Sequence, residues 1–185
     1  LNGSGGKAEW AIAWPSDEND YFNSYCNTVP TPLGGTHENG MRGAIVKGLK
    51  AYGELVSNRQ ASKITADDAL GGACVMLSVF ITDPQFQGQT KEKLSTIEAQ
   101  KLVENAVRDH FDHWLAGDPE RSKTLLERVV ERAEERLRKR SIKETKRASA
   151  TRKLRLPGKL TDCTSKTSEG TELFLVEGDS AGGSA

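Results

Sequence analysis

The chain has 185 residues, of which 36% are hydrophobic and 28% are charged. A chain of this length holds one full domain, or one domain and part of a second, and its apolar content is too high for disorder throughout. The sequence contains no apolar run of the ~18 residues that a membrane helix needs. It also lacks the pattern of a secretion signal. We therefore exclude a membrane-spanning protein and expect no membrane partner.

Positive and negative charges balance over the whole chain, with 26 Lys or Arg and 26 Asp or Glu. The balance conceals a strongly basic block, because residues 136–159 contain eleven Lys or Arg and one acidic residue, a net charge of +10. Residues 1–135 carry a net charge of −6 and residues 160–185 a net charge of −4. Such a block favours a polyanionic partner over the alternative of a solvated helix face.

The basic block contains no aromatic residue, so stacking on bases is not expected and any nucleic-acid binding should be non-specific. The candidate phosphate-binding residues are Arg138, Lys139, Arg140, Lys143, Lys146, Arg147, Arg152, Lys153 and Arg155.

Cysteine and histidine are too few and too scattered for a disulfide scaffold or a zinc site. Cys26, Cys74 and Cys163 form no CxxC pair, and we expect them to be free thiols in a reducing cytoplasm. His110 and His113 are three residues apart on a predicted helix, but no third metal ligand accompanies them.

The N-terminal part of the chain predicts two strands and a helix. Residues 1–6 are linker-like, and apolar and small side chains then alternate through residues 10–14, as in a strand. A returning strand over residues 21–29 would complete a β-hairpin. Residues 36–39 open a helix with apolar residues at helical spacing.

Helices and strands interleave along the rest of the chain, which predicts an α/β or α+β class. The expected elements are a helix start at 65–68, a buried strand at 74–81, a helix from a capping box at 95–98 to about residue 116, a long helix from Pro119 past Arg140, and a strand at 173–176.

Two segments have the composition of ligand-binding turns. In residues 83–91, Gly88 would let the backbone approach a ligand and Lys91 would offer a positive charge to a phosphate, although many such loops hold a solvated lysine. After the strand at 173–176, Glu177 and Asp179 provide two carboxylates that suit Mg²⁺. An ordinary turn with solvated acids explains the second pattern equally well.

Glycines at Gly34 and Gly35 precede the helix that opens at residue 36. Glycines in this position can form an anion site at the helix N-terminus, but we favour a turn and a cap. His37 could carry a proton, and we favour a structural role for it.

Four segments together carry a family resemblance: residues 34–37, 83–91, 156–163 and 172–185 (ELFLVEGDSAGGSA). In this order and spacing they resemble the B subunit of bacterial type IIA topoisomerases, the family that comprises DNA gyrase and topoisomerase IV. The resemblance spans residues 8–185. Residues 83–95 look more like topoisomerase IV than gyrase.

The resemblance implies an α+β fold, with a transducer domain similar to ribosomal protein S5 domain 2 and long C-terminal helices, followed by the first strand of a Toprim α/β domain. The implied boundaries are a linker or disordered start at 1–7, the transducer at 8–153, and a connector with an incomplete Toprim start at 154–185. The chain would be a fragment of the subunit, inactive by itself.

The resemblance also implies the function and its site. The family couples ATP binding and hydrolysis to DNA gate motion in double-strand passage, which supports decatenation and relaxation. Lys91 resembles the lysine that reaches the γ-phosphate, with Gln89 beside it, and Glu177 resembles the Mg²⁺-linked glutamate of Toprim. Asp179 lies where quinolone-type drugs bind in the family.

The implied cofactors are ATP and Mg²⁺, both of which would need parts of the protein absent from this chain. The implied partners are DNA, the topoisomerase A subunit and a second B subunit, in a bacterial cytoplasm. Three alternatives stay open: a gyrase B fragment that supports negative supercoiling, a non-catalytic basic module that binds nucleic acid, and the transducer of another GHKL protein. The segment from Glu177 to Gly183 argues against the last of these.

Overall fold

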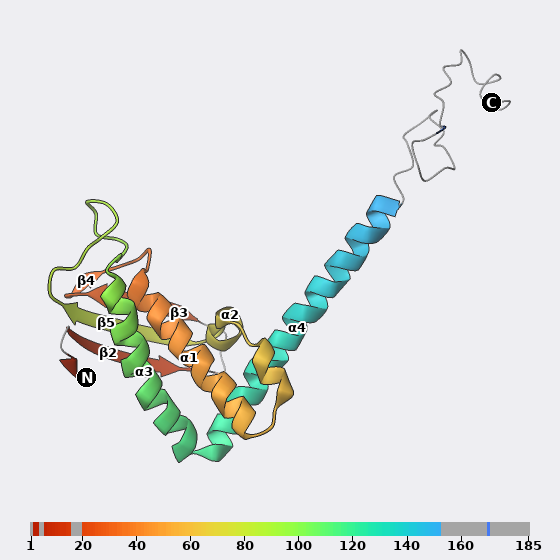
Figure 1. Cartoon of the computed structure of the whole chain (residues 1–185), viewed down its shortest axis with the longest axis horizontal. Coiled ribbons are helices and arrows are strands. Elements are labelled where there is room, and N and C mark those ends of the chain that lie inside the picture. Colours follow the sequence, from red (N-terminus) through yellow and green to blue (C-terminus); the bar gives the residue numbers. More distant parts are fainter. Residues whose placement is uncertain (1, 4–5, 16–19, 153–169, 171–185) are drawn as a thin grey trace, which may run out of the picture. The chain divides into compact units, whose positions relative to one another are not determined.

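The computed structural model describes residues 2–3, 6–15, 20–152 and 170 (Figure 1). The chain divides into two units, Leu1–Leu137 and Arg138–Ala185, and the first contains the sheet. Its strands are β1 (Asn2–Gly3), β2 (Gly6–Ala13), β3 (Tyr21–Cys26), β4 (Val29–Pro30) and β5 (Cys74–Ile81). The helices are α1 (Thr36–Leu55), the 3-10 helix η1 (Arg59–Lys63), α2 (Ala66–Leu70), α3 (Ile97–Gly117) and α4 (Pro119–Arg152).

The sheet has the order β1-β2-β5-β3-β4, with β5 antiparallel to β2 and parallel to β3. The predicted β-hairpin is therefore wrong, because β5 lies between the two strands that were expected to pair. β5 alternates buried and partly exposed residues, and Val75, Leu77 and Val79 are almost fully buried. A strand with such an apolar face stabilises the sheet most at its centre, where the helices cover it.

The start of the chain also differs from the predicted linker over residues 1–7. Asn2 pairs with Lys7 and Gly3 with Gly6, so β1 and the beginning of β2 add an edge to the sheet. In contrast, the strand at 74–81 and the helix start at 65–68 are confirmed by β5 and α2. The Thr65 backbone N–H donates to Asp68 Oδ2 and the Asp68 backbone N–H donates to the Thr65 side chain, which together form the capping box of α2.

The helix expected from a capping box at 95–98 begins at Ile97, but the box does not form. The Ser95 hydroxyl donates to the Gln85 carbonyl at 3.0 Å, and the Thr96 hydroxyl accepts from the Gln85 backbone N–H at 2.8 Å. Both side chains thus bind the preceding loop at Gln85. These hydrogen bonds replace the local capping box that the sequence predicted.

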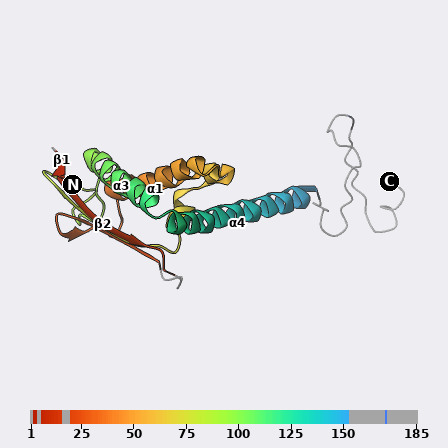
Figure 2. The same ribbon diagram turned by 90° about the horizontal axis from the view of Figure 1, so that it is seen from below.

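Helices α1 and α3 pack together on one face of the sheet (Figure 2). Two glycines of α1 allow their close approach. A Cβ atom at Gly40 would lie 2.4 Å from the backbone oxygen of Gln100, and one at Gly48 would lie 2.6 Å from the Phe111 ring. Met41, Ile45 and Leu49 of α1 are fully buried in the core beside this contact.

Helix α4 starts at Pro119, as predicted, and three arginines at four-residue spacing attach its first half to the rest of the unit. Arg128 donates to the Trp14 and Pro15 carbonyls, and Arg132 lies against the Gly71–Gly72 turn. Arg136 binds Asp68 through both carboxylate oxygens. Burial alone raises the pKa of Asp68, but hydrogen bonds from Arg136 and Thr65 and the charge of Arg136 outweigh it, so the pKa is lowered.

A buried polar chain connects β3, the turn after β4 and the start of α1. His37 Nε2 lies 3.0 Å from Thr31 Oγ1, which lies 2.6 Å from Ser24 Oγ, and the Ser24 hydroxyl donates to Glu38 Oε1 at 2.7 Å. His37 is fully buried and its Nδ1 has no partner among the described residues. Burial lowers the pKa of His37 to about 4, so the imidazole is neutral at pH 7.

None of the helices in the described part of the chain is long and apolar enough to cross a membrane. The predicted strand at 173–176 lies outside the described residues.

We predict opposite effects for alanine at two glycines of α1. Gly40→Ala should reduce the free energy of unfolding by about 2–3 kcal/mol, because its methyl group would collide with backbone. Gly43→Ala is the matched control on the same helix, since a Cβ there meets nothing within 4 Å, and it should stabilise by roughly 0.5–1 kcal/mol. Urea unfolding of both variants measures the difference. Equal effects at the two positions would show that α1 and α3 are not in close contact.

We further predict that stability falls as the pH drops from 6.5 towards 4. The unfolded chain binds a proton on His37 in this range and the folded chain does not, since the pKa falls from the ordinary 6.5 to about 4. At about 1.4 kcal/mol per pKa unit, this corresponds to ~3 kcal/mol lost over the window.

Urea unfolding of the wild-type chain from pH 7.5 to 4.5 checks this prediction. His37→Gln should flatten the profile between pH 6.5 and 5, whereas His113→Gln, at an exposed position, should leave it unchanged. A histidine NMR titration of the wild-type chain provides a readout that does not depend on the variant's folding. An imidazole at His37 that titrates near 6.5 would contradict the prediction.

Candidate functional site

The connection between β5 and α3, here called the 82–96 loop, carries the predicted phosphate-binding residues and extends beyond the sheet (Figure 1). Its two arms are held together by backbone hydrogen bonds. The Ser95 N–H donates to the Gln85 carbonyl and the Gln87 N–H to the Lys93 carbonyl, each at 2.8 Å. These bonds restrict the conformations of the loop without any ligand.

The base of the 82–96 loop is attached to the start of α1. The Leu94 N–H donates to the Gly34 carbonyl and the Thr36 N–H donates to the Leu94 carbonyl, both at 3.0 Å. Gly35 has φ +145°, and a Cβ atom there would lie 2.2 Å from the Leu94 oxygen. The glycines therefore allow the two backbone segments to approach closely, in keeping with a turn and a cap. The Thr36 N–H already donates to the Leu94 carbonyl, so it is not available to an anion at the helix N-terminus.

The tip of the loop exposes Gln89 and Lys91, which line a small cavity of about 430 Å³ with Phe86 and Gly88. Neither side chain has a hydrogen-bond or ion-pair partner among the described residues. Lys91 adopts φ +58°, an uncommon conformation for a residue with a side chain, and Gly88 has φ +87° with open space around it. The tip thus presents one amide and one ammonium group to solvent on a braced loop.

Seven of the nine predicted basic residues lie on α4 in the other unit. Arg138, Lys139, Arg140 and Lys143 are exposed, and Arg140 pairs with Glu144 one turn further on, at 3.0 Å. The other candidates on α4 are Lys146, Arg147 and Arg152. Lys153, Arg155, Glu177 and Asp179 lie outside the described residues.

The described residues contain no group of three His, Cys, Asp or Glu that could hold a metal ion. His110 and His113, considered as metal ligands in the sequence, are both exposed on α3. His37 is buried in the polar chain described above, in keeping with a structural role.

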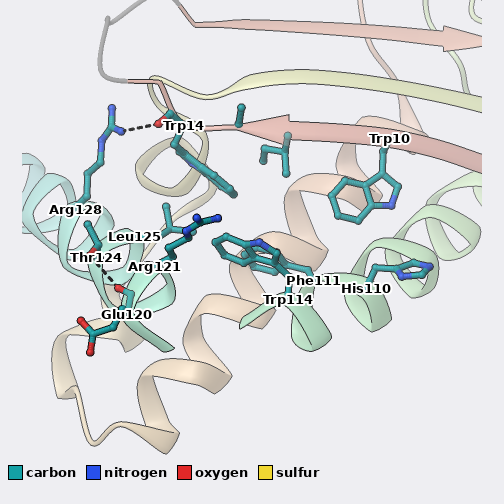
Figure 3. Close-up of a pocket in the computed structure, with 12 residues that line it drawn as sticks. Trp10, Trp14, His110, Phe111, Trp114, Glu120, Arg121, Thr124, Leu125 and Arg128 are labelled. Atoms are coloured by element: carbon teal, nitrogen blue, oxygen red, sulfur yellow. Dashed lines mark hydrogen bonds between the residues drawn. The ribbon is translucent and has the colours of Figure 1, made fainter. Parts of the chain in front are cut away.

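Sequence reasoning missed a second feature, an aromatic groove of about 770 Å³ lined by β2, α3 and α4 (Figure 3). The alternation of Trp10, Ile12 and Trp14 indicated a strand but not an open space beside it. A signal was available, since Trp10 and Trp14 fall on one face of that strand. The partner residues come from helices about 100 positions away, which no local pattern reveals.

A family model described as DNA gyrase B matches residues 2–145 of this chain. The B subunit of DNA topoisomerase 4 from Bartonella bacilliformis is 60% identical over 180 residues, and that from Caulobacter vibrioides is 58% identical over 187. The alignments cover 97% and 99% of this chain but 26% and 27% of the relatives. The chain therefore spans about a quarter of the length of these relatives.

Two solved structures resemble the fold. The topoisomerase IV ATP-binding domain of Francisella tularensis, in complex with a small-molecule inhibitor, is 36% identical with a TM-score of 0.66, covering 74% of this chain and 38% of that one. The 43K ATPase domain of Thermus thermophilus gyrase B, in complex with an aminocoumarin, is 26% identical with a TM-score of 0.69, covering 78% of this chain and 39% of that one.

These comparisons correct the predicted fold class, an S5 domain 2-like transducer followed by the first Toprim strand. The matching structures are an ATP-binding domain and an ATPase domain, so the chain corresponds to the ATPase region, built here as a mixed sheet covered by helices. Interleaved strands and helices are common to many α+β folds, and the segment that suggested Toprim lies outside the described residues.

The same structures do not support the expectation that ATP and Mg²⁺ need parts of the protein absent from this chain. With a family model matching residues 2–145 and relatives at 58–60% identity, this chain belongs to the DNA gyrase B family of type IIA topoisomerase B subunits.

Proposed function

We propose that this chain is part of the B subunit of a topoisomerase IV, and that Gln89 and Lys91 contact the γ-phosphate of ATP. The observation that carries the proposal is the tip of the 82–96 loop, where both side chains are exposed and have no partner among the described residues. The identity of 60% to the B subunit of a DNA topoisomerase 4 supports topoisomerase IV over gyrase.

The residues at the tip suit a phosphate. An ammonium group is a point charge that attracts phosphate oxygens, and an amide adds a directed hydrogen bond. Negative charge on the terminal phosphoryl group is stabilised by a cation that is already in position. The hydrogen bonds between the two arms restrict the loop backbone that carries Lys91, which supports such a role.

The attachment of the loop base provides a route for coupling. Leu94 is bonded to Gly34 and Thr36, so a displacement of the loop changes the start of α1. α1 in turn packs on α3 through Gly40 and Gly48. We propose that loss of the γ-phosphate releases the loop, and that this change couples ATP hydrolysis to DNA gate motion during decatenation and relaxation.

The remaining site residues are proposed from the sequence. Glu177 would supply a carboxylate for Mg²⁺ near the DNA phosphate that is cleaved, and Asp179 would lie beside the drug site. The exposed basic residues of α4 would contact DNA without sequence preference, which suits a DNA segment of any sequence. The proposed partners are DNA, the topoisomerase A subunit and a second B subunit.

We predict that Lys91→Ala in the complete B subunit with its A subunit lowers ATP turnover by roughly 10²–10³-fold, because the positioned positive charge is lost. Decatenation of interlinked circles should fall with it. Lys93→Ala is the matched control, since Lys93 is exposed on the same loop and only its carbonyl bonds within it. Normal turnover in Lys91→Ala would refute the role of Lys91. Negative supercoiling by the wild-type enzyme would assign the chain to gyrase instead.

We also predict that the basic part of α4 makes DNA affinity strongly salt-dependent. Each phosphate contact contributes about 0.9 to the slope of log affinity against log salt, so Arg138→Gln with Lys143→Gln should reduce the slope by about 2. Lys123→Gln, an exposed lysine nearer the start of the same helix, serves as the control. Fluorescence anisotropy with a duplex of arbitrary sequence measures the slope. An unchanged slope in the double variant would place the DNA contacts elsewhere.

A further inference from the structure

The aromatic groove gathers all three tryptophans of the chain, Trp10, Trp14 and Trp114 (Figure 3). The rings of Trp14, Phe111 and Trp114 form a cluster with centroids 5.9–6.4 Å apart and interplanar angles of 9–34°. Phe111 is almost fully buried, so Trp14 and Trp114 supply the aromatic surface of this cluster that borders the groove. Flat walls of this kind favour a planar ligand over a branched one.

The groove contains polar groups that the fold leaves unused. The Trp14 indole N–H donates to the Ala69 carbonyl at 2.9 Å, but the N–H groups of Trp10 and Trp114 have no partner among the described residues. Trp114 is also 39% exposed, which is high for a residue of this size in contact with other rings. Trp114 therefore leaves aromatic surface exposed at the groove.

The α4 side of the groove adds positive charge. Arg128 is engaged by the Trp14 and Pro15 carbonyls, so its guanidinium helps to shape the wall. Arg121 is 78% exposed, and its contact with Asp118 at 3.1 Å is a surface ion pair of little energetic weight. Glu120 is the one acidic residue of the lining. Arg121 can therefore exchange its surface partner for an anionic group bound in the groove.

We propose that this groove binds a small planar aromatic anion. Its fused rings would lie against Trp14 and Trp114, and its acidic group would accept hydrogen bonds from Arg121. The volume of about 770 Å³ falls in the range of small-molecule sites, which are concave, largely apolar and equipped with a few polar groups. The groove shares no residue with the 82–96 loop, so this inference does not depend on the proposed function.

The test uses the intact chain and 2-naphthoate as the probe, measured by isothermal titration calorimetry. Quenching of tryptophan emission gives an independent readout, because every tryptophan lines the groove. We expect saturable one-to-one binding, about tenfold tighter than binding of the neutral 2-naphthamide, because the charge-assisted contact is lost. Cyclohexanecarboxylate, which is anionic but not planar, should bind more weakly still.

Three variants locate the site. Trp114→Ala removes a wall, and Thr124→Trp places a ring in the groove from an exposed helix position, so both should weaken 2-naphthoate at least about tenfold. Arg121→Gln should abolish the preference for the anion while leaving 2-naphthamide binding unchanged. Arg59→Gln, an exposed arginine outside the groove, is the control.

Unchanged binding in both Trp114→Ala and Thr124→Trp would overturn the inference. So would equal affinity for 2-naphthoate and 2-naphthamide in the wild type. Loss of the effect through unfolding is excluded by circular dichroism, and Thr124→Trp keeps the test decisive if Trp114→Ala does not fold. Binding of neither probe, with self-association of the chain, would assign the groove to a protein contact instead.

Discussion

The close approach of α1 and α3 is the constraint on which both functional regions depend. Gly40 has no room for a Cβ atom beside the Gln100 backbone, and Gly48 has none beside the Phe111 ring, so the two helices approach more closely than larger residues would allow. The start of α1 fixes Leu94 and with it the base of the 82–96 loop. Further along, Gly48 receives the buried Phe111 ring, which packs against Trp14 and Trp114 of the aromatic groove. The contact between α1 and α3 thus positions both the 82–96 loop and the aromatic groove.

The buried polar chain fixes the direction in which α1 begins. If Ser24 donates to Glu38, its oxygen is free to accept from Thr31, and Thr31 can then accept from His37 Nε2–H. This order of donors leaves Nδ1 without a proton, consistent with a neutral imidazole and with its lack of a partner among the described residues. A directional chain of this kind specifies one arrangement of the turn and the helix, which hydrophobic packing alone does not.

Local signals in the sequence predict local structure well here and long-range structure poorly. The buried strand at β5 and the helix start at residues 65–68 follow from residues within a few positions, so their prediction is confirmed. The strand order could not be predicted, because β5 enters between β2 and β3 from about 50 residues away. The exposure of Lys91 follows from its loop composition, but the bracing of that loop through Leu94 and Gly34 is a tertiary contact. The aromatic groove is missed for the same reason.

The arginines of α4 show why net charge alone does not define a DNA-binding surface. Arg128, Arg132 and Arg136 follow one another at four-residue spacing, yet each is held against carbonyls, a glycine turn or Asp68 of its own unit. Arg136 is the first residue of the basic block in the sequence, but its guanidinium is paired with Asp68 and contributes to the stability of the fold. The charge available to a polyanion therefore starts two residues later, at Arg138, where the helix side chains are exposed. Glu144, the one acidic residue of the basic block, forms only a surface pair with Arg140.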